Sequence, residues 1–136
     1  MNGVANGTVW TARSGSSLLV VAMGGHASNA TLRDLAALLD RELQALAAPA
    51  VILDATGLGG LDADLRQGGL LLLSTLRARG APFAAVASPR KAVRMIGSAI
   101  SFAARYPVSF VDRMDEAHAL VEAHARRAGP GKSGPR

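Results

Sequence analysis

Apolar positions follow two different spacings along the chain, and the change between them separates the expected strands from the expected helices. Short apolar runs bounded by glycine, serine or proline predict strands. Apolar residues three and four apart predict helices, most clearly where Leu32, Leu35, Leu39, Leu43 and Leu46 form one stripe. The strands are expected at 8–13, 18–23, 51–53, 83–87 and 108–111, and the helices at 31–48, 62–79, 89–105 and 112–128.

The order of these elements is ββαβαβαβα, which predicts an α/β fold. Strands that alternate with helices run parallel with right-handed crossovers, whereas the short turn at 14–16 predicts an antiparallel hairpin at the start. We therefore expect a mixed, mostly parallel sheet of about five strands with four helices. One domain should span 8–128, between a flexible N-terminus at 1–7 and a disordered basic tail at 129–136.

The stretch Val51–Leu73 is the most informative part of the pattern. A buried strand ends on Asp54, a glycine-rich turn is expected at 55–61, and Asp62 and Asp64 precede a long leucine-rich run. Carboxylates at the start of a helix accept hydrogen bonds from its free amide groups, so these two acids are expected to cap the second helix. Loops at the carboxyl ends of strands are where partners and ligands bind in open α/β sheets. The sequence therefore places a candidate site at this strand-to-helix junction.

Glycine has several expected roles in the pattern. The segment at 24–26 is expected to break the second strand. Gly68 and Gly69 each lower helix propensity by ~1 kcal/mol within the second helix. Close packing of that helix against its neighbours would explain them, and so would a partner backbone lying against them.

The start of the third helix also admits two interpretations. A serine followed by proline is a strong helix start, and the first turns after it carry three basic residues. Amide groups at a helix start attract anions when cations lie beside them, so the alternatives are a solvated face and an anion site. The residues of that anion site would be Ser88, Arg90, Lys91 and Arg94.

Composition excludes several classes of protein. The 136 residues are 49% hydrophobic and 18% charged, which indicates a globular domain. The absence of cysteine excludes disulfides and thiolate metal sites. The net charge is +5, but +4 of it comes from the last eleven residues, so specific nucleic-acid binding is not expected. No apolar run approaches the ~20 residues of a membrane span and no signal peptide is recognisable, which predicts a cytoplasmic protein.

The residue types used in catalysis occur without the spacing that catalysis needs. His118 and His124 are six residues apart, on different faces of one expected helix, so they do not predict a metal site. No serine occupies a nucleophile elbow between a strand and a helix. We therefore predict a protein that is not an enzyme, with no catalytic residue, no metal and no cofactor. A hydrolase is the least favoured function.

Three segments, together with the order of elements, resemble the STAS domain superfamily, the anti-sigma-factor-antagonist fold with its SpoIIAA-like branch. They are VILDATGLGGLDADL at 51–65, LRARGAPFAAVASPRKAVRMI at 76–96 and FVDRMDEAHALV at 110–121, within a similarity that covers 8–128. In antagonists of this family, partner kinases phosphorylate a serine of an Asp-Ser-Ser-Gly motif at the start of the second helix. The resemblance places Asp62 on the motif aspartate, Ala63 and Asp64 on the serines, and Leu65 on the glycine. The chain therefore lacks the phosphorylatable hydroxyl and carries at Asp64 a permanent charge smaller than that of phosphate.

The resemblance implies two alternative functions. The first is a non-catalytic STAS-like interaction module whose partner is an anti-sigma-factor-like or other regulatory protein, with self-association as a homodimer. The second is a binder of an apolar or lipid-like ligand or of a membrane surface, because the SpoIIAA-like branch is similar in architecture to lipid-binding CRAL-TRIO domains. The expected partner-binding residues are Thr56, Asp62, Ala63, Asp64, Leu65, Arg66, Gly68 and Gly69.

Overall fold

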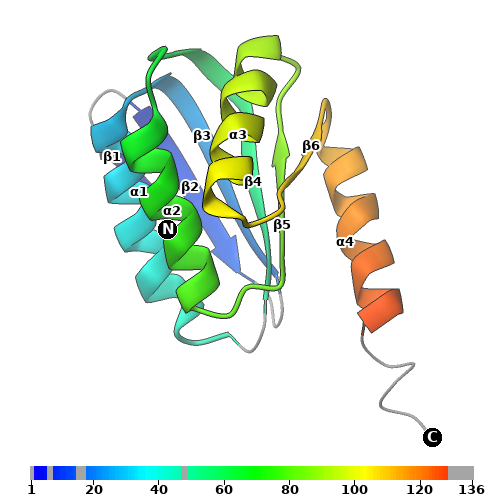
Figure 1. Ribbon diagram of the computed structural model, residues 1–136. Coiled ribbons are helices and arrows are strands. Elements are labelled where there is room, and N and C mark those ends of the chain that lie inside the picture. Colours follow the sequence, from blue (N-terminus) through cyan, green and yellow to red (C-terminus); the bar gives the residue numbers. More distant parts are fainter. Residues whose placement is uncertain (1, 6–7, 15–17, 47–48, 129–136) are drawn as a thin grey trace, which may run out of the picture.

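A single sheet of six strands runs through the protein in the order β1-β2-β3-β4-β5-β6 (Figure 1). The computed structural model describes residues 2–5, 8–14, 18–46 and 49–128. The first three strands pair antiparallel and the last three are parallel to β3. The strands are β1 (Asn2–Ala5), β2 (Thr8–Ser14), β3 (Leu18–Ala27), β4 (Ala50–Leu61), β5 (Phe83–Ala87) and β6 (Ser109–Val111).

Helices cover the two faces of this sheet unequally. The side chains of β3 and β4 alternate between faces, so Val51 joins the larger core cluster under three helices while Ile52 joins a smaller cluster on the other face. That smaller cluster includes Ala117 of the last helix, which lies alone on its side in Figure 1. The helices are α1 (Asn29–Leu43), α2 (Arg66–Ala78), α3 (Lys91–Ala104) and α4 (Met114–Ala128).

The predicted α/β class, the four helices and the mostly parallel sheet are confirmed. The predicted number of strands, about five, is one too low because Asn2–Ala5 forms β1 within the segment expected to be a flexible N-terminus. It pairs with β2 in the register Asn2↔Thr11. Such pairing uses backbone groups only, so side-chain patterns gave little sign of it. The predicted tail at 129–136 lies outside the described residues.

The glycine segments expected to break β3 and to follow β4 are parts of these strands. Beyond Asp54, β4 pairs only with β3, through Gly24↔Gly57 and on to Ala27↔Leu61, with two register shifts. A Cβ at Gly57 would lie 3.0 Å from the carbonyl oxygen of Met23, so the absence of a side chain permits this close backbone approach. The predicted turn at 55–61 and strand break at 24–26 are therefore wrong. Figure 1 shows this two-strand extension bending towards the start of α2.

Each of the four helices begins a few residues from its predicted start. Ser28 rather than Thr31 caps α1, and its side-chain oxygen accepts a hydrogen bond from the Thr31 amide at 3.2 Å. The first helical residue of α2 is Arg66, so Asp62 belongs to the preceding loop. Among the described residues, no helix is long and apolar enough to cross a membrane.

Candidate docking surface

The start of α2 is held by polar contacts that the two predicted acids make separately. Asp64 precedes the N-cap residue Leu65, and its Oδ1 accepts a hydrogen bond from the amide of Arg66, the first helical residue, at 3.2 Å. Asp62 instead pairs with His26 of β3, with 2.7 Å between Oδ1 and Nε2. Both side chains of this pair are about half exposed, at 56% for the histidine and 51% for the aspartate. The carboxylates thus tie the junction to two different elements.

Asn29, the first residue of α1, connects the two helix starts. Its side-chain oxygen accepts a hydrogen bond from the amide of Gly68 at 2.8 Å. Its side-chain nitrogen donates to the carbonyl oxygen of Asp64 at 3.0 Å. One amide side chain therefore fixes both the loop before α2 and the first turn of that helix, which positions the exposed residues between them.

Gly68 and Gly69 are buried and face neighbouring helices rather than solvent. A Cβ at Gly68 would lie 2.8 Å from the Asn29 carbonyl oxygen, and one at Gly69 would lie 2.6 Å from Cδ1 of Ile100 on α3. Leu65 is also buried, at 5% exposure. Close helix packing explains the glycine pair. Gly68 and Gly69 are therefore not exposed to a partner, and Leu65 offers a partner little surface.

A groove of about 190 Å³ runs between the start of α2 and the side of α3. We call it the α2–α3 groove. One rim comes from the loop and helix start and the other from α3, while buried or half-buried side chains form the floor. Its residues are Ala63, Asp64, Leu65, Arg66, Ile96, Ala99, Ile100 and Ala103.

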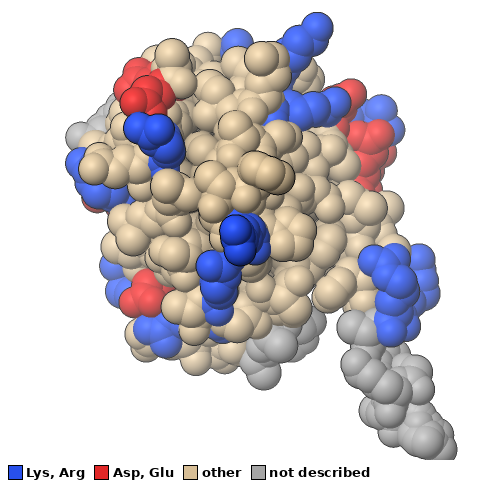
Figure 2. Space-filling model, in the orientation of Figure 1, with Lys and Arg blue, Asp and Glu red and all other residues tan. Residues whose placement is uncertain are grey.

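Large apolar side chains lie exposed on the helix that forms one side of this groove. On α3, Met95 is 65% exposed and Phe102 is 87% exposed, and Leu71 of α2 is 43% exposed. Figure 2 shows a broad region free of Lys, Arg, Asp and Glu on the face where α2 and α3 lie. Exposed apolar area of this kind is typical of surfaces that bind another protein. The charges of Asp64 and Arg66 lie at its edge.

A second groove lies on the other side of the α2 start. It separates α2 from α1, has a volume of about 350 Å³ and is lined by Asn29, Asp64, Arg66, Gln67 and Leu70. Asp64 and Arg66 therefore form a ridge between two grooves. Thr56 lines neither of them: its hydroxyl and amide donate to Oδ1 of Asp54, at 2.5 and 3.1 Å, on the exposed part of β4. Thr56 therefore contributes to neither groove.

The predicted anion-binding residues are divided among different contacts. Ser88 is buried, and its hydroxyl oxygen accepts a hydrogen bond from the Arg90 amide at 3.1 Å. The Arg90 side chain donates from Nε to the carbonyl oxygen of Leu58 at 2.9 Å, and Arg94 pairs with Asp112. Local hydrogen bonds and an ion pair thus occupy two of the three cations. The Arg90 and Arg94 side chains therefore contact different partners instead of forming one cationic group, which favours the solvated face of the two interpretations.

The groove contains residues that the sequence analysis did not select. Ile96, Ala99 and Ala103 belong to it, and Met95 and Phe102 are exposed beside it. The sequence carried a signal for them, because the apolar residues of α3 extend beyond the predicted stripe to Met95, Ala99 and Phe102. An apolar face of a helix that extends past its buried stripe is left exposed unless a partner covers it. Among the described residues, no group of three His, Asp or Glu side chains is arranged to hold a metal ion.

Three solved structures are similar to this chain. An anti-sigma factor antagonist from Mycobacterium paratuberculosis has 16% identity and a TM-score of 0.57, covering 85% of this chain and 94% of that one. The anti-sigma factor antagonist SpoIIAA in its unphosphorylated form has 16% identity and a TM-score of 0.56, covering 89% and 99%. An uncharacterised DUF3478-family protein with a SpoIIAA-like fold, from Shewanella loihica, has 13% identity and a TM-score of 0.57, covering 88% and 96%.

At these identities the similarity shows the fold, and the chain has the STAS, SpoIIAA-like fold that its sequence resembles. No family model and no curated protein matches the sequence.

Proposed function

We propose that this protein is a non-enzymatic regulatory module that binds another protein through the α2–α3 groove. The observation that carries the proposal is the exposed apolar surface of α3, where Phe102 is 87% exposed and the adjacent residue Ala103 lines a groove with a charged rim. Apolar anchors surrounded by polar groups are the usual composition of a protein interface. The names of two similar structures, both anti-sigma factor antagonists, support a regulatory protein as the partner.

The chemistry of the groove defines what the partner must present. Ile96, Ala99 and Ala103 offer a shallow apolar surface that suits a partner's aliphatic or aromatic side chain. Asp64 and Arg66 supply one acceptor and one donor of opposite charge at the rim. The partner segment therefore combines apolar anchors with charged residues at its edge, as an amphipathic helix does.

We infer that this module lacks a phosphorylation switch in the groove. The family resemblance assigns Ala63 and Asp64 to the places of the two motif serines, and neither residue has a hydroxyl. The Asp64 carboxylate already accepts a hydrogen bond from the Arg66 amide, so its negative charge is built into the helix start. Binding to the partner is then constitutive and depends on the partner's concentration.

Site-specific photocrosslinking tests this proposal in cells that make the protein. A photoreactive residue replaces Ala99, which is exposed in the groove, and in a matched variant it replaces Ala125, which is exposed on α4 across the sheet. The proposal predicts a discrete protein adduct at position 99 that is absent at position 125. Equal adducts at both positions, or none at either, would contradict it.

The same crosslinks separate a different partner from a second copy of the chain. A homodimer formed through the groove gives an adduct of twice the chain mass, and light scattering of the purified protein then shows a dimer. An adduct of any other mass identifies a different protein, which mass spectrometry names. The proposal requires an adduct with a different protein. An adduct of twice the chain mass would show self-association in place of a regulatory partner.

A further inference from the structure

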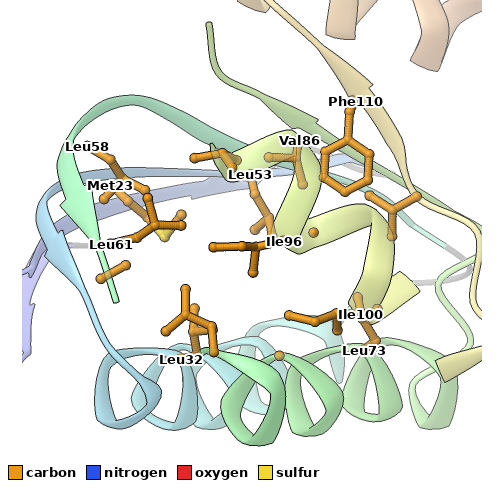
Figure 3. A pocket seen from close by; sticks show the side chains of 16 residues that line it. Met23, Leu32, Leu53, Leu58, Leu61, Leu73, Val86, Ile96, Ile100 and Phe110 are labelled. Atoms are coloured by element: carbon orange, nitrogen blue, oxygen red, sulfur yellow. The ribbon is translucent and has the colours of Figure 1, made fainter. Parts of the chain in front are cut away.

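The interior beneath the docking surface contains an apolar cavity of about 100 Å³ (Figure 3). It lies between α2 and α3 on one side and the sheet on the other. All sixteen residues that line it are apolar. A water molecule needs two to four polar partners to be held in a protein interior, so this space does not suit water. The cavity therefore has the chemistry of an apolar ligand site.

Tight contacts of α3 with β6 and with α2 prevent the walls of the cavity from closing. A Cβ at Gly97 of α3 would lie 2.5 Å from the Phe110 ring, and one at Gly69 of α2 would lie 2.6 Å from Ile100. Because the backbones already touch these side chains, α3 has no room to move towards β6 or α2 and close the space. The distal part of β4, with Leu58 and Leu61, forms another wall in Figure 3. The site is thus formed before any ligand arrives.

Entry to the cavity is available from the surface. Leu61, Ile96 and Phe110 line the space and are only half-buried, so their outer atoms face solvent. In Figure 3 the side chain of Ile96 points into the middle of the cavity. Rotation of this single side chain would widen the opening without moving the backbone. Aliphatic side chains of this kind change rotamer rapidly when they are partly exposed.

We propose that this cavity binds a small apolar molecule of about the size of benzene. An engineered protein cavity of about 150 Å³ with a similar aliphatic and aromatic lining stays dry and binds benzene or xenon. A space of about 100 Å³ is somewhat smaller, which sets the upper limit on the ligand. Sites for drug-sized ligands occupy about 300–1,000 Å³. A lipid tail is therefore too large, and the ligand class narrows from lipid-like molecules to short hydrocarbons and simple aromatic rings.

Nuclear magnetic resonance of methyl groups tests this site on the full chain, with benzene as the probe. The expected result is a saturable shift of the methyl signals of Leu53, Val93 and Ile100, which line the cavity from β4 and α3. Methyl signals of Leu38 and Leu43, buried in α1 and absent from the lining, should not move. Shifts spread over exposed residues such as Met95, without saturation, would overturn the proposal.

Two variants make the result specific to the cavity. Ile96→Phe fills the space and is expected to lower benzene affinity roughly tenfold or more, which corresponds to 1.4 kcal/mol. Val86→Leu adds only one methylene to another wall, so it keeps the test informative if the first variant does not fold. Unchanged benzene affinity in a folded variant of either kind would overturn the assignment. No partner is present in these measurements, so their outcome is independent of the proposed docking function.

Discussion

The side-chain oxygen of Asn29 accepts a hydrogen bond from the backbone amide of Gly68 at 2.8 Å, although the two residues are 39 positions apart in the chain. An amide in the first turn of a helix has no partner within the helix. Asn29 supplies that partner from the first residue of α1. The exposed ridge at the start of α2 is therefore positioned from outside its own helix.

Removing this connection should destabilise the fold. Asn29→Ala leaves the partly buried Gly68 amide without its acceptor, which costs about 1–3 kcal/mol. Asn29→Asp keeps an acceptor for that amide and loses only the donor to the Asp64 carbonyl, so its cost should be smaller. Urea unfolding measures both variants. Equal stability of Asn29→Ala and the wild type would contradict the role given to this residue.

The two glycines of α2 should respond differently to the same substitution. In Gly68→Ala the new methyl meets the Asn29 backbone oxygen at 2.8 Å, and overpacking of this kind costs about 1–3 kcal/mol. In Gly69→Ala it meets the end of the Ile100 side chain, which has the adjacent cavity to move into. Replacing a glycine by alanine also raises helix propensity by about 1 kcal/mol, which offsets part of the packing cost in each variant.

Thermal unfolding of the two glycine variants distinguishes these cases. We expect Gly68→Ala to be clearly less stable than Gly69→Ala, and Gly69→Ala to remain close to the wild type. The reverse order would show that α2 is held more tightly by α3 than by α1, against the contacts described above.

Tyr106 should make stability fall in alkaline solution. Its hydroxyl donates to the Ala81 carbonyl oxygen at 2.7 Å, and burial raises its pKa from 10.0 to about 12, with Arg77 opposing the shift slightly. The neutral phenol is thus favoured in the folded state. The stability that it contributes is fully present below pH 10 and is lost as the pH rises towards 12.

The variant Tyr106→Phe isolates this effect because the chain has a single tyrosine. At neutral pH the variant should be less stable by about 0.5–1.5 kcal/mol, since it lacks the hydrogen bond. The difference from the wild type should shrink between pH 10 and pH 12. Ultraviolet absorbance of the phenolate follows the same titration directly. A midpoint near 10 in the folded protein would contradict the burial argument.

The acids at the α2 start should contribute modestly to partner binding. Exposed charge pairs are worth about 0.2–1 kcal/mol each, so Asp62→Ala together with Asp64→Ala should weaken binding by up to about thirtyfold. Asp64→Asn serves as the control because its side-chain oxygen still accepts from the Arg66 amide while the charge is gone. Unchanged circular dichroism with unchanged partner affinity in the double variant would show that these acids serve only the fold.

Sequence patterns predicted the helices and the central strands well, because their apolar stripes reflect burial directly. Leu32, Leu35 and Leu39 are all buried as the spacing indicated. The patterns failed where backbone contacts decide the structure. Gly57 lies in a strand because its missing side chain admits the Met23 carbonyl, and no propensity scale encodes that neighbour. The same limit explains β1, whose pairing depends on an available sheet edge.

The sequence predicted the side of the candidate site that belongs to the start of α2, but not the side that belongs to α3. The four residues from Ala63 to Arg66 were selected from the strand-to-helix junction, and all of them line the groove. Arg90, selected for its charge, instead donates to a strand carbonyl 32 residues away. The α3 residues of the groove were missed because an amphipathic stripe reports the buried face of a helix and says little about a second apolar face. Ala99 becomes a candidate contact residue only because α3 lies beside the start of α2 in the folded protein.

The affinity of the purified protein for its crosslinked partner, measured by calorimetric titration, tests the docking surface most directly. Ala99→Glu places a charge in the α2–α3 groove, and Ala125→Glu places the same charge on the opposite side of the sheet. We expect Ala99→Glu to lower the affinity at least roughly tenfold, since an unpaired charge in an apolar contact costs more than 1.4 kcal/mol. Ala125→Glu should bind as the wild type does. Equal affinities for all three proteins would contradict the account.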